Sequence, residues 1–260
     1  MYKKPYNPIM LAGVILILVS LACSSSATPT VVPTDTIIPP TATATLKPTS
    51  TPRPTATPNI AKTKEAEADQ ATLQKYVDSG YIASTEGTLY TLQSTSFEMA
   101  QKNYLNIEDS GYHDPVLDFA FWGDLKWSSA GQVNYPEYSG CGIAFRVGDN
   151  FVDQYTAMIT NESVLVTWCF AALGNRCGRV GVTRGKGRVK FGNPAEAHFE
   201  FIENSGHAYA LVNGEFIGEY TLFQDRLTEP GYFTYSIISG TNKDYGTRCS
   251  VDNAKLWVPK

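Results

Sequence analysis

The feature that most constrains the fold is a series of short segments in which apolar and polar residues alternate, from Tyr81 to the C-terminal region. Such alternation predicts half-buried β-strands. Gly, Asn or Asp bounds most segments, and Asn213-Gly214 is the strongest hairpin signal. No interval has room for a helical crossover between parallel strands, so we predict an all-β sandwich or barrel. The expected strands cover residues 117–127, 142–147, 154–159, 163–168, 195–202, 207–212, 216–222, 231–238 and 248–258.

The segment before this domain is predicted to be helical. Residues 60–80 are rich in helix formers, and Ala66, Leu73, Tyr76 and Val77 form a thin apolar stripe at helical spacing. Gly80 is a suitable stop. We expect a short spacer helix over 60–80, packed on the edge of a domain over 81–260 by Tyr76 alone.

The first 23 residues have the pattern of an export signal. Two lysines precede an apolar run of about thirteen residues, whereas a membrane-spanning helix needs roughly 20. The run ends in Ser20-Leu21-Ala22-Cys23, which resembles the lipobox of bacterial lipoproteins, although Ser20 stands where Leu is usual. We predict that Cys23 is diacylated. Ordinary cleavage after Ala22, or an uncleaved anchor helix, are the alternatives.

Residues 24–59 consist mainly of Thr, Pro, Ala and Ser, a composition that cannot bury a core. Proline favours extended polyproline II, at about 3.1 Å per residue, so the segment could reach roughly 110 Å. We predict a disordered stalk. Together with the anchor, it predicts a domain displayed outside the cell and held to the membrane by lipid.

The charge distribution argues against nucleic acid as a partner. Four of the 21 basic residues and one of the 25 acidic residues precede residue 60, which leaves 17 basic and 24 acidic residues, a net charge of −7. An acidic domain is poorly suited to phosphate backbones. We expect a monomer.

Four cysteines follow the stalk, and an even number in an exported chain predicts two disulfides, with three connectivities open. Cys169 and Cys177 flank a turn-like segment and could bridge neighbouring strands, which would leave Cys141 with Cys249. Zinc is the alternative, but CxxC and HxxxH spacings are absent.

Three motifs resemble those of concanavalin A-like jelly rolls. The segment 141–147 resembles their G-x-x-F-R-V strand, 199–215 their long hairpin ending in V-N-G, and 251–257 their closing D-N strand. The similarity spans residues 115–260 and is close to laminin-G-like and 3-keto-disaccharide-hydrolase-like modules. It implies a jelly-roll sandwich of two antiparallel sheets. This fold serves lectins, glycosidases, adhesion modules and spacers alike.

Catalysis on such a fold would need paired carboxylates facing one cleft. Glu196-x-His198-x-Glu200 comes nearest, but His198 stands where the laminarinase-type pattern has Asp, and we interpret these residues as a solvated strand face. Nucleophile motifs are absent. A glycoside or keto-sugar hydrolase is therefore the enzymatic alternative, and we predict no catalysis.

Sugar recognition uses an aromatic platform flanked by hydrogen-bonding side chains. The candidate ligand-binding residues are Tyr138, Tyr155, Trp168 and Tyr245, with Arg146 and Asn253 as polar partners. Trp122, Trp127 and Trp257 are expected in the core. No cofactor is required, although calcium is possible at Asp149-Asn150 or Asp252-Asn253. We predict a surface-anchored, non-catalytic binding module, most simply for carbohydrate; a structural or protein-interaction sandwich is the alternative.

Overall fold

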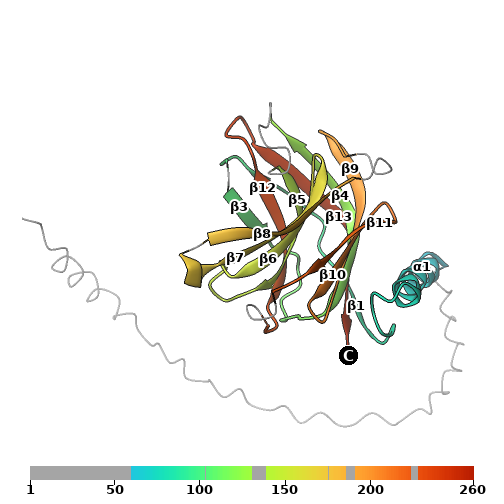
Figure 1. Ribbon diagram of the computed structural model, residues 1–260. Coiled ribbons are helices and arrows are strands. Elements are labelled where there is room, and N and C mark those ends of the chain that lie inside the picture. Colours follow the sequence, from blue (N-terminus) through green and yellow to red (C-terminus); the bar gives the residue numbers. More distant parts are fainter. Residues whose placement is uncertain (1–59, 103, 131–138, 175, 186–190, 224–227) are drawn as a thin grey trace, which may run out of the picture. The chain divides into compact units, whose positions relative to one another are not determined.

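The computed structural model describes residues 60–260 apart from 103, 131–138, 175, 186–190 and 224–227 (Figure 1). The predicted signal peptide with Cys23, the predicted stalk and the candidate Tyr138 lie outside the described residues. Among the described residues, no helix has both the length and the apolar character needed to cross a bilayer.

Two antiparallel sheets make up the domain, and the predicted all-β jelly-roll sandwich is confirmed (Figure 1). The seven-stranded sheet runs in the order β1 (Gly87–Thr91), β13 (Thr247–Pro259), β4 (Phe119–Ser129), β9 (Ala195–Asn204), β10 (His207–Val212), β11 (Glu215–Thr221), and β2 (Thr95–Met99) also pairs with β13. The six-stranded sheet runs in the order β3 (Tyr104–Glu108), β12 (Tyr232–Ser239), β5 (Gly140–Val147), β6 (Gln154–Thr160), β7 (Ser163–Phe170), β8 (Arg176–Arg184).

The core between the sheets is built largely from aromatic rings. Phe119 on β4 makes edge contacts with Phe145 on β5, at 5.4 Å between ring centroids, and with Phe233 on β12, at 5.2 Å. These rings are fully buried because alternate residues of each strand point inward. Trp127 belongs to the same core, as predicted.

A disulfide joins the two sheets through this core. Cys141 on β5 and Cys249 on β13 are bonded, with a Cα–Cα distance of 5.8 Å. The second disulfide joins Cys169 on β7 to Cys177 on β8, which lie directly opposite each other in the strand register. Two disulfides are therefore confirmed, and the chain adopts the pairing in which neighbouring strands are bridged.

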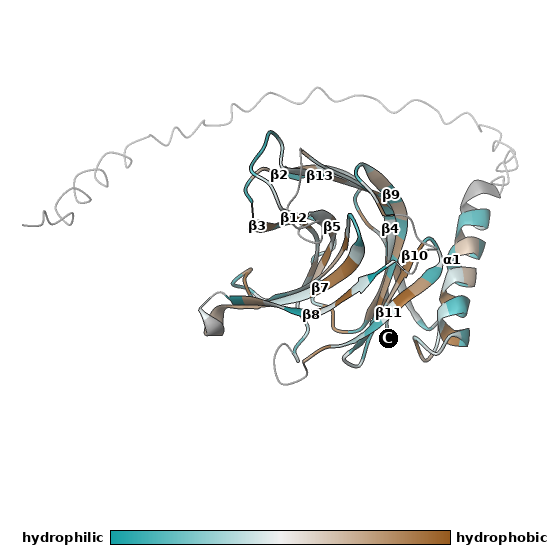
Figure 2. Ribbon diagram, turned by 45° about the horizontal axis from the view of Figure 1, so that its top comes forward, coloured by the Kyte–Doolittle hydropathy of each residue, from teal (hydrophilic) through white to brown (hydrophobic). Residues whose placement is uncertain are grey.

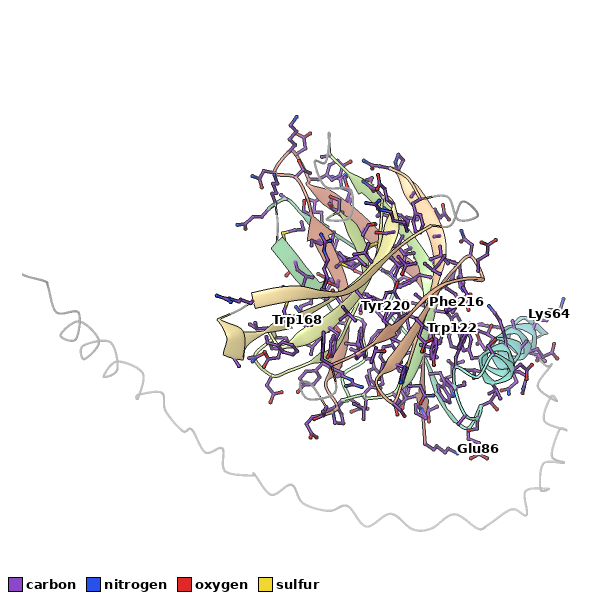
Figure 3. All side chains as sticks on the ribbon, viewed as in Figure 1. Lys64, Glu86, Trp122, Trp168, Phe216 and Tyr220 are labelled. Atoms are coloured by element: carbon purple, nitrogen blue, oxygen red, sulfur yellow. A yellow bond between two sulfur atoms is a disulfide. The ribbon has the colours of Figure 1, made fainter. Side chains whose placement is uncertain are left out.

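The predicted helix forms as α1 (Ile60–Asp78) and covers one end of the outer face of the seven-stranded sheet. Its surface is mostly hydrophilic (Figure 2), and its contact with the sheet is an apolar patch that we call the helix-covered cluster. This cluster comprises Leu73, Tyr76, Ile82, Ala120, Trp122, Ile202, Leu211 and Trp257. Trp122 and Trp257 are buried, as predicted. They lie under the helix, however, and not between the two sheets. Figure 3 shows Trp122 on the side facing α1.

Polar bonds fix the helix as well, so the expectation that Tyr76 alone would hold it was wrong. The Tyr76 hydroxyl donates to Glu200 Oε2 at 2.8 Å, and Lys75 Nζ lies 3.2 Å from the same oxygen. Lys255 on β13 reaches Glu65 at 2.5 Å and Asp69 at 3.8 Å. Burial raises the pKa of Asp69, and Lys255 partly offsets this.

The hairpin predicted at Asn213-Gly214 joins β10 to β11. Asn213 has φ of +52° and Gly214 φ of +79°. Two successive left-handed residues give a tight turn that matches the strand twist, and Asn and Gly are the residues that tolerate this conformation. This prediction is confirmed.

Candidate functional site

Two of the predicted ligand-binding residues lie in the interior. Tyr155 has no exposed surface, its ring stacks on Phe145 at 5.5 Å, and its hydroxyl donates to the carbonyl of Phe223 at 3.1 Å. Arg146 is 5% exposed and Nη2 lies 2.6 Å from Glu203 Oε1. A buried ring and a buried ion pair cannot form a surface platform, so this part of the prediction is corrected.

Trp168 is partly buried against the inner side of the six-stranded sheet (Figure 3). It pairs with Tyr155 across β6 and β7, so the two side chains share one face of the sheet. The ring stacks on Phe170 at 4.9 Å. A Cβ added at the opposite Gly178 would come within 2.4 Å of the indole. These contacts indicate a packing role for Trp168.

The last two candidates lie near the outer face of the seven-stranded sheet, beyond the end that α1 covers. The Arg248 guanidinium lies 4.1 Å from the Tyr245 ring centroid. Asn253 Nδ2 donates to Asp124 Oδ2 at 2.8 Å, and His198 Nδ1 lies 2.8 Å from Asp124 Oδ1. Desolvation acts to raise the pKa of Asp124, but the bonds from Asn253 and His198 outweigh it and lower the pKa.

A shallow groove of about 500 Å³ crosses the same face. It is lined by Ser96, Lys126, Trp127, Ser128, Pro194, Ala195, Glu196, Arg248, Cys249 and Ser250. Its charges are paired: Lys126 with Glu196 of the lining at 3.3 Å, and Arg248 with Glu98, which lies outside the lining, at 3.0 Å. The groove is open, and the one acid of its described lining, Glu196, already has a partner.

The carboxylates considered for hydrolysis do not face one cleft. Glu196 is exposed beside Lys126, whereas Glu200 is 3% exposed beneath α1. The interpretation of Glu196, His198 and Glu200 as a solvated face is therefore wrong for Glu200. The helix that covers Glu200 is the physical reason, because it removes this carboxylate from solvent.

A second and more enclosed cavity, of about 290 Å³, lies at the other sheet, where β3 ends and β12 begins. We call it the Phe151 pocket; it is lined by Ile107, Glu108, Asp109, Tyr112, His113, Phe151, Tyr232 and Thr234. Phe151 is 58% exposed, and its ring lies nearly parallel to that of Tyr232, with 6.3 Å between centroids and 15° between planes. An exposed aromatic ring stacked on a second ring at the mouth of a cavity is a feature of ligand sites.

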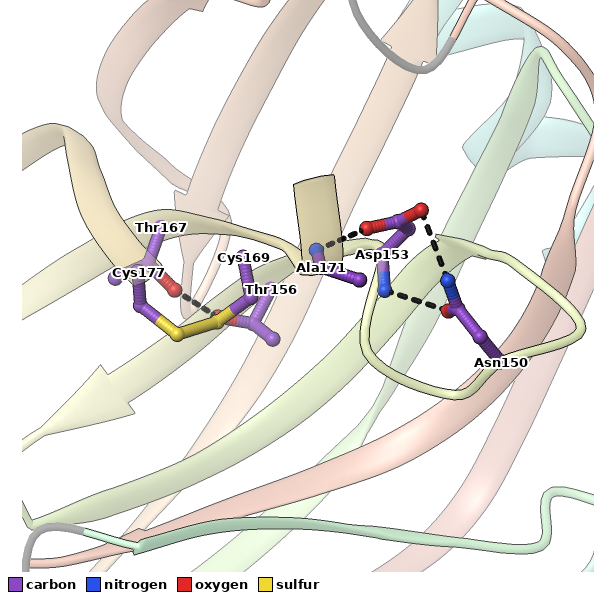
Figure 4. Close-up of a disulfide and its surroundings, with 7 residues drawn as sticks. All are labelled: Asn150, Asp153, Thr156, Thr167, Cys169, Ala171 and Cys177. Atoms are coloured by element: carbon purple, nitrogen blue, oxygen red, sulfur yellow. Dashed lines mark hydrogen bonds between the residues drawn. A yellow bond between two sulfur atoms is a disulfide. The ribbon is translucent and has the colours of Figure 1, made fainter. Parts of the chain in front are cut away.

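One wall of the Phe151 pocket is the loop 148–153 between β5 and β6. Asn150 Oδ1 accepts from the backbone N–H groups of Val152 and Asp153, both at 2.9 Å. Asp153 Oδ1 accepts from the N–H of Ala171 at 2.6 Å. Figure 4 shows the bonds of Asp153 to Asn150 and to Ala171 beside the Cys169–Cys177 disulfide. Phe151 itself has φ of +53°, a strained conformation for a bulky residue that this surrounding network maintains.

The opposite wall is the turn at residues 109–113, which is held in the same manner. Asp109 Oδ1 accepts from the N–H of Gly111 at 2.8 Å, and Gly111 has φ of +77°. The Ser110 hydroxyl is buried and donates to the carbonyl of Phe233 at 2.8 Å. Side-chain bonds thus preorganise both walls before any ligand arrives.

The polar groups of the Phe151 pocket suit a hydroxyl-rich ligand. Asp109 is part of the lining, and its Oδ1 already accepts from the N–H of Gly111. The Thr234 hydroxyl is buried without a hydrogen-bond partner among the described residues. Burial raises the pKa of Tyr112, with Tyr90 and Asp114 adding to the effect, so its hydroxyl stays protonated.

Sequence reasoning did not identify Phe151 and Tyr232 as candidates. One signal was present in the sequence. Phe151 follows the turn-forming residues Gly148-Asp149-Asn150, and an aromatic residue in a turn is not part of a strand whose inner face could bury it. Tyr232 carried no signal of its own, because alternation did not distinguish which end of β12 opens to solvent.

Metal binding has little geometric support in the described part of the chain. No three His, Cys, Asp or Glu side chains gather there as ligands. Asn150 is engaged within its own loop, and Asn253 with Asp124. The asparagines of the two pairs at which calcium is possible thus hold local structure.

Comparisons with known proteins give distant structural similarity. No family model and no curated protein matches the chain. The carbohydrate-binding module CBM66 from Bacillus subtilis aligns at 9% identity and a TM-score of 0.44, over 65% of this chain and 96% of that one. A fructosyltransferase from A. japonicus aligns at 11% identity and a TM-score of 0.41, over 66% of this chain and 26% of that one. The receptor binding domain of botulinum neurotoxin D aligns at 9% identity and a TM-score of 0.40, over 67% of this chain and 45% of that one. With every TM-score below 0.5, these similarities establish neither a family nor an activity.

Proposed function

We propose that this protein is a non-catalytic glycan-binding module and that the Phe151 pocket is its binding site. The observation that carries the proposal is Phe151 itself: a 58% exposed aromatic ring, held in a strained left-handed conformation by a hydrogen-bonded loop. Backbone strain concentrates at ligand sites, where preorganisation offsets its cost. A solvent-exposed phenylalanine that only filled space would not need such a support.

The chemistry of the Phe151 pocket fits a sugar ring. The apolar face of a pyranose packs on an aromatic ring, and its hydroxyl groups bond to nearby polar side chains. The pocket offers Phe151 and Tyr232 for the first contact, and Asp109 and Thr234 for the second. A volume of about 290 Å³ is at the lower end for ligand pockets and suits one or two sugar units.

The test is a glycan-array screen of purified residues 60–260, followed by titration of the best ligand with Phe151→Ala. Removal of the ring should weaken binding by about tenfold, in line with the upper end of the roughly 0.5–1.5 kcal/mol of a stacked aromatic contact. Phe216→Ala is the matched control, since Phe216 is 46% exposed on β11, away from the pocket lining.

Two results would refute the proposal. Correctly folded, disulfide-bonded protein that binds no glycan on the array would favour the structural or protein-interaction alternative. Glycan binding that Phe151→Ala leaves unchanged would place the site elsewhere, with the groove lined by Lys126, Glu196 and Arg248 as the next surface to mutate.

We also propose that the module is displayed outside the cell through a lipid on Cys23. The proposal is supported by the sequence 20–23 and by the Thr/Pro-rich segment after it. Metabolic labelling of the full chain with a fatty-acid analogue in a bacterial host should give a labelled band that Cys23→Ala abolishes. An unlabelled wild-type chain, secreted without the first 22 residues, would show ordinary signal cleavage instead.

A further inference from the structure

Strand β8 is a sheet edge that carries positive charge. It ends the six-stranded sheet, and among the described strands it pairs with β7 alone. Its nine residues include three exposed arginines, Arg176, Arg179 and Arg184, and no acidic residue. The strands at the other ends of the two sheets differ from it, since β3 and β11 carry glutamate without a basic residue and β1 carries no charge. Within the described part of the chain, β8 is therefore the basic edge.

The charge on this edge is not neutralised by neighbouring acids. On the opposite sheet, Arg248 is paired with Glu98 at 3.0 Å. Among the described residues, by contrast, no carboxylate lies within ion-pair distance of Arg176 or Arg184. In a chain with a net charge of −4, two such arginines on one strand are a local exception. A carboxylate that approaches β8 can bond to them without displacing an existing partner.

Two of the three arginines share one face of the sheet. The register places Arg184 opposite Ser163 and Arg179 opposite Thr167 on β7. Ser163 and Thr167 are four residues apart on one strand, so their side chains point to the same face. Arg179 and Arg184 therefore point to that face as well. A strand added beside β8 would place every second side chain next to them.

Strand β8 is also held rigidly along its length. Cys177 is bonded to Cys169, which lies directly opposite on β7. The Tyr220 hydroxyl of β11 donates to the Thr183 hydroxyl at 3.1 Å. A Cβ added at Gly181 would come within 2.7 Å of the Tyr220 ring, so this ring packs directly against the backbone of β8. A strand that is ordered in advance loses little conformational freedom when a partner pairs with its edge.

From these observations we propose that β8 docks an extended acidic segment of a protein partner, which adds to the sheet as a further strand. Alternate residues of an edge strand direct their N–H and C=O groups away from the sheet, and these groups can pair with an incoming strand. The arginines would bond to its carboxylates. An anionic glycan would use the arginines alone, whereas a polypeptide uses the backbone groups as well. No residue of β8 lines the Phe151 pocket, so this docking edge does not depend on the proposed function.

The charge contact is tested by fluorescence-anisotropy titration of the disulfide-bonded chain with a labelled nine-residue peptide of alternating glutamate and threonine. We expect saturable binding that the double variant Arg179→Glu with Arg184→Glu weakens by about tenfold, because two attractive contacts become repulsive. The matched control, Lys126→Glu with Arg248→Glu, changes the net charge equally on the opposite sheet. It should alter the affinity by less than about threefold, since exposed charges are screened over about 8–10 Å at physiological ionic strength. Circular dichroism checks that both variants are folded.

Strand pairing is tested with two further peptides, one N-methylated at every threonine and one at every glutamate. Both keep the charge of the parent peptide. In an extended strand, alternate residues point their N–H groups to opposite edges, so only one of the two series faces β8. We expect one methylated peptide to bind at least about tenfold more weakly than the parent and the other to bind nearly as well, because several hydrogen bonds are lost on one edge only.

Three results would overturn the proposal. Equal binding of the parent and both methylated peptides would show that β8 attracts anions without pairing with a strand, and competition by polygalacturonate would then indicate an anionic glycan as the ligand. Peptide binding that survives the double arginine variant would place the contact elsewhere. Failure of the folded protein to bind the parent peptide would show that the arginines protect the edge against association. Glycan binding through Phe151 is measured independently of all three.

Discussion

Asp153 and Ala171 are joined by a 2.6 Å hydrogen bond, in which the backbone N–H of Ala171 donates to Asp153 Oδ1 (Figure 4). Asp153 closes the loop that carries Phe151, and Ala171 follows Cys169 by two residues at the end of β7. The bond thus connects the aromatic wall of the pocket to the segment braced by the Cys169–Cys177 disulfide. The orientation of Phe151 depends on residues that do not touch the pocket.

The first prediction concerns this connection. Asp153→Ala should lower affinity for the array-identified glycan by about three- to tenfold, since the loop must then be ordered on binding at a cost of about 1 kcal/mol. Asp153→Asn retains an acceptor oxygen and should lose less. Titration of both variants is the measurement. Equal affinity in Asp153→Ala and wild type would show that the loop holds its shape without this bond.

The two disulfides should contribute unequally to stability. In the chain-entropy model, Cys141–Cys249, with a sequence separation of 108, contributes about 5 kcal/mol, and Cys169–Cys177, with a separation of 8, about 2.5 kcal/mol. Paired Cys→Ser variants in denaturant unfolding measure the difference. If the Cys169–Cys177 variant lost the larger amount, native-state contacts rather than loop closure would dominate.

The buried Glu203–Arg146 pair leads to a pH prediction. Burial raises the pKa of Glu203 from 4.5 to about 7, although Arg146 and the N–H of Gly206 act to lower it. Between about pH 4.5 and 7 the folded state then binds more protons than the unfolded state, so this group's contribution to the unfolding free energy falls as pH rises, by at most about 3 kcal/mol.

Glu203→Gln isolates that contribution. The variant does not titrate, so the unfolding free energy of wild type relative to the variant should decrease from pH 4.5 to 7. Denaturant unfolding at several pH values provides the measurement. An increase over the same range would mean that the attraction of Arg146, 2.6 Å away, outweighs burial and lowers the pKa of Glu203 in the folded state.

The helix contact gives a prediction about buried polar bonds. Tyr76→Phe removes the hydroxyl that bonds to Glu200 Oε2 within a buried environment and should cost about 1–3 kcal/mol. Lys75→Ala removes a half-exposed partner of the same carboxylate and should cost less than about 1 kcal/mol. Thermal unfolding of both variants checks the order. A larger loss for Lys75→Ala would show that the charge, rather than the buried hydroxyl, stabilises Glu200.

The strands, the Asn213-Gly214 hairpin and the helix were predictable because each has a local cause in the sequence. Alternation of apolar and polar residues favours a strand, and a dipeptide that tolerates left-handed backbone angles favours a tight turn. The strands β1 and β2 were less evident, since each of their residues is either half-buried or exposed and none is fully buried. The outer face of the seven-stranded sheet was misjudged at Glu200 because a helix more than 120 residues away in sequence covers it.

The candidate site was harder to predict, because exposure depends on tertiary placement. Tyr155 shares a strand face with Ala157 and Ile159, an alternation that does indicate the core. Arg146 has φ of +49° at a bulge beside β12, and no sequence rule foresaw that its side chain would reach Glu203. Phe151 and Tyr232 are 81 positions apart and meet only when β5, β6 and β12 assemble.

The Cys141–Cys249 disulfide also determines how the chain responds to mechanical tension. A force that pulls on the two ends of the folded domain can lengthen only the segments outside the covalent loop. The 108-residue separation enclosed by the bond keeps roughly 370 Å of contour length from extending, at about 3.4 Å per residue. Loop 148–153 and both strands of the Cys169–Cys177 bridge lie inside that protected interval, whereas α1 and β1 to β4 lie before it. Tension at a surface would therefore extend those earlier segments first, while the segment carrying Phe151 stays tethered.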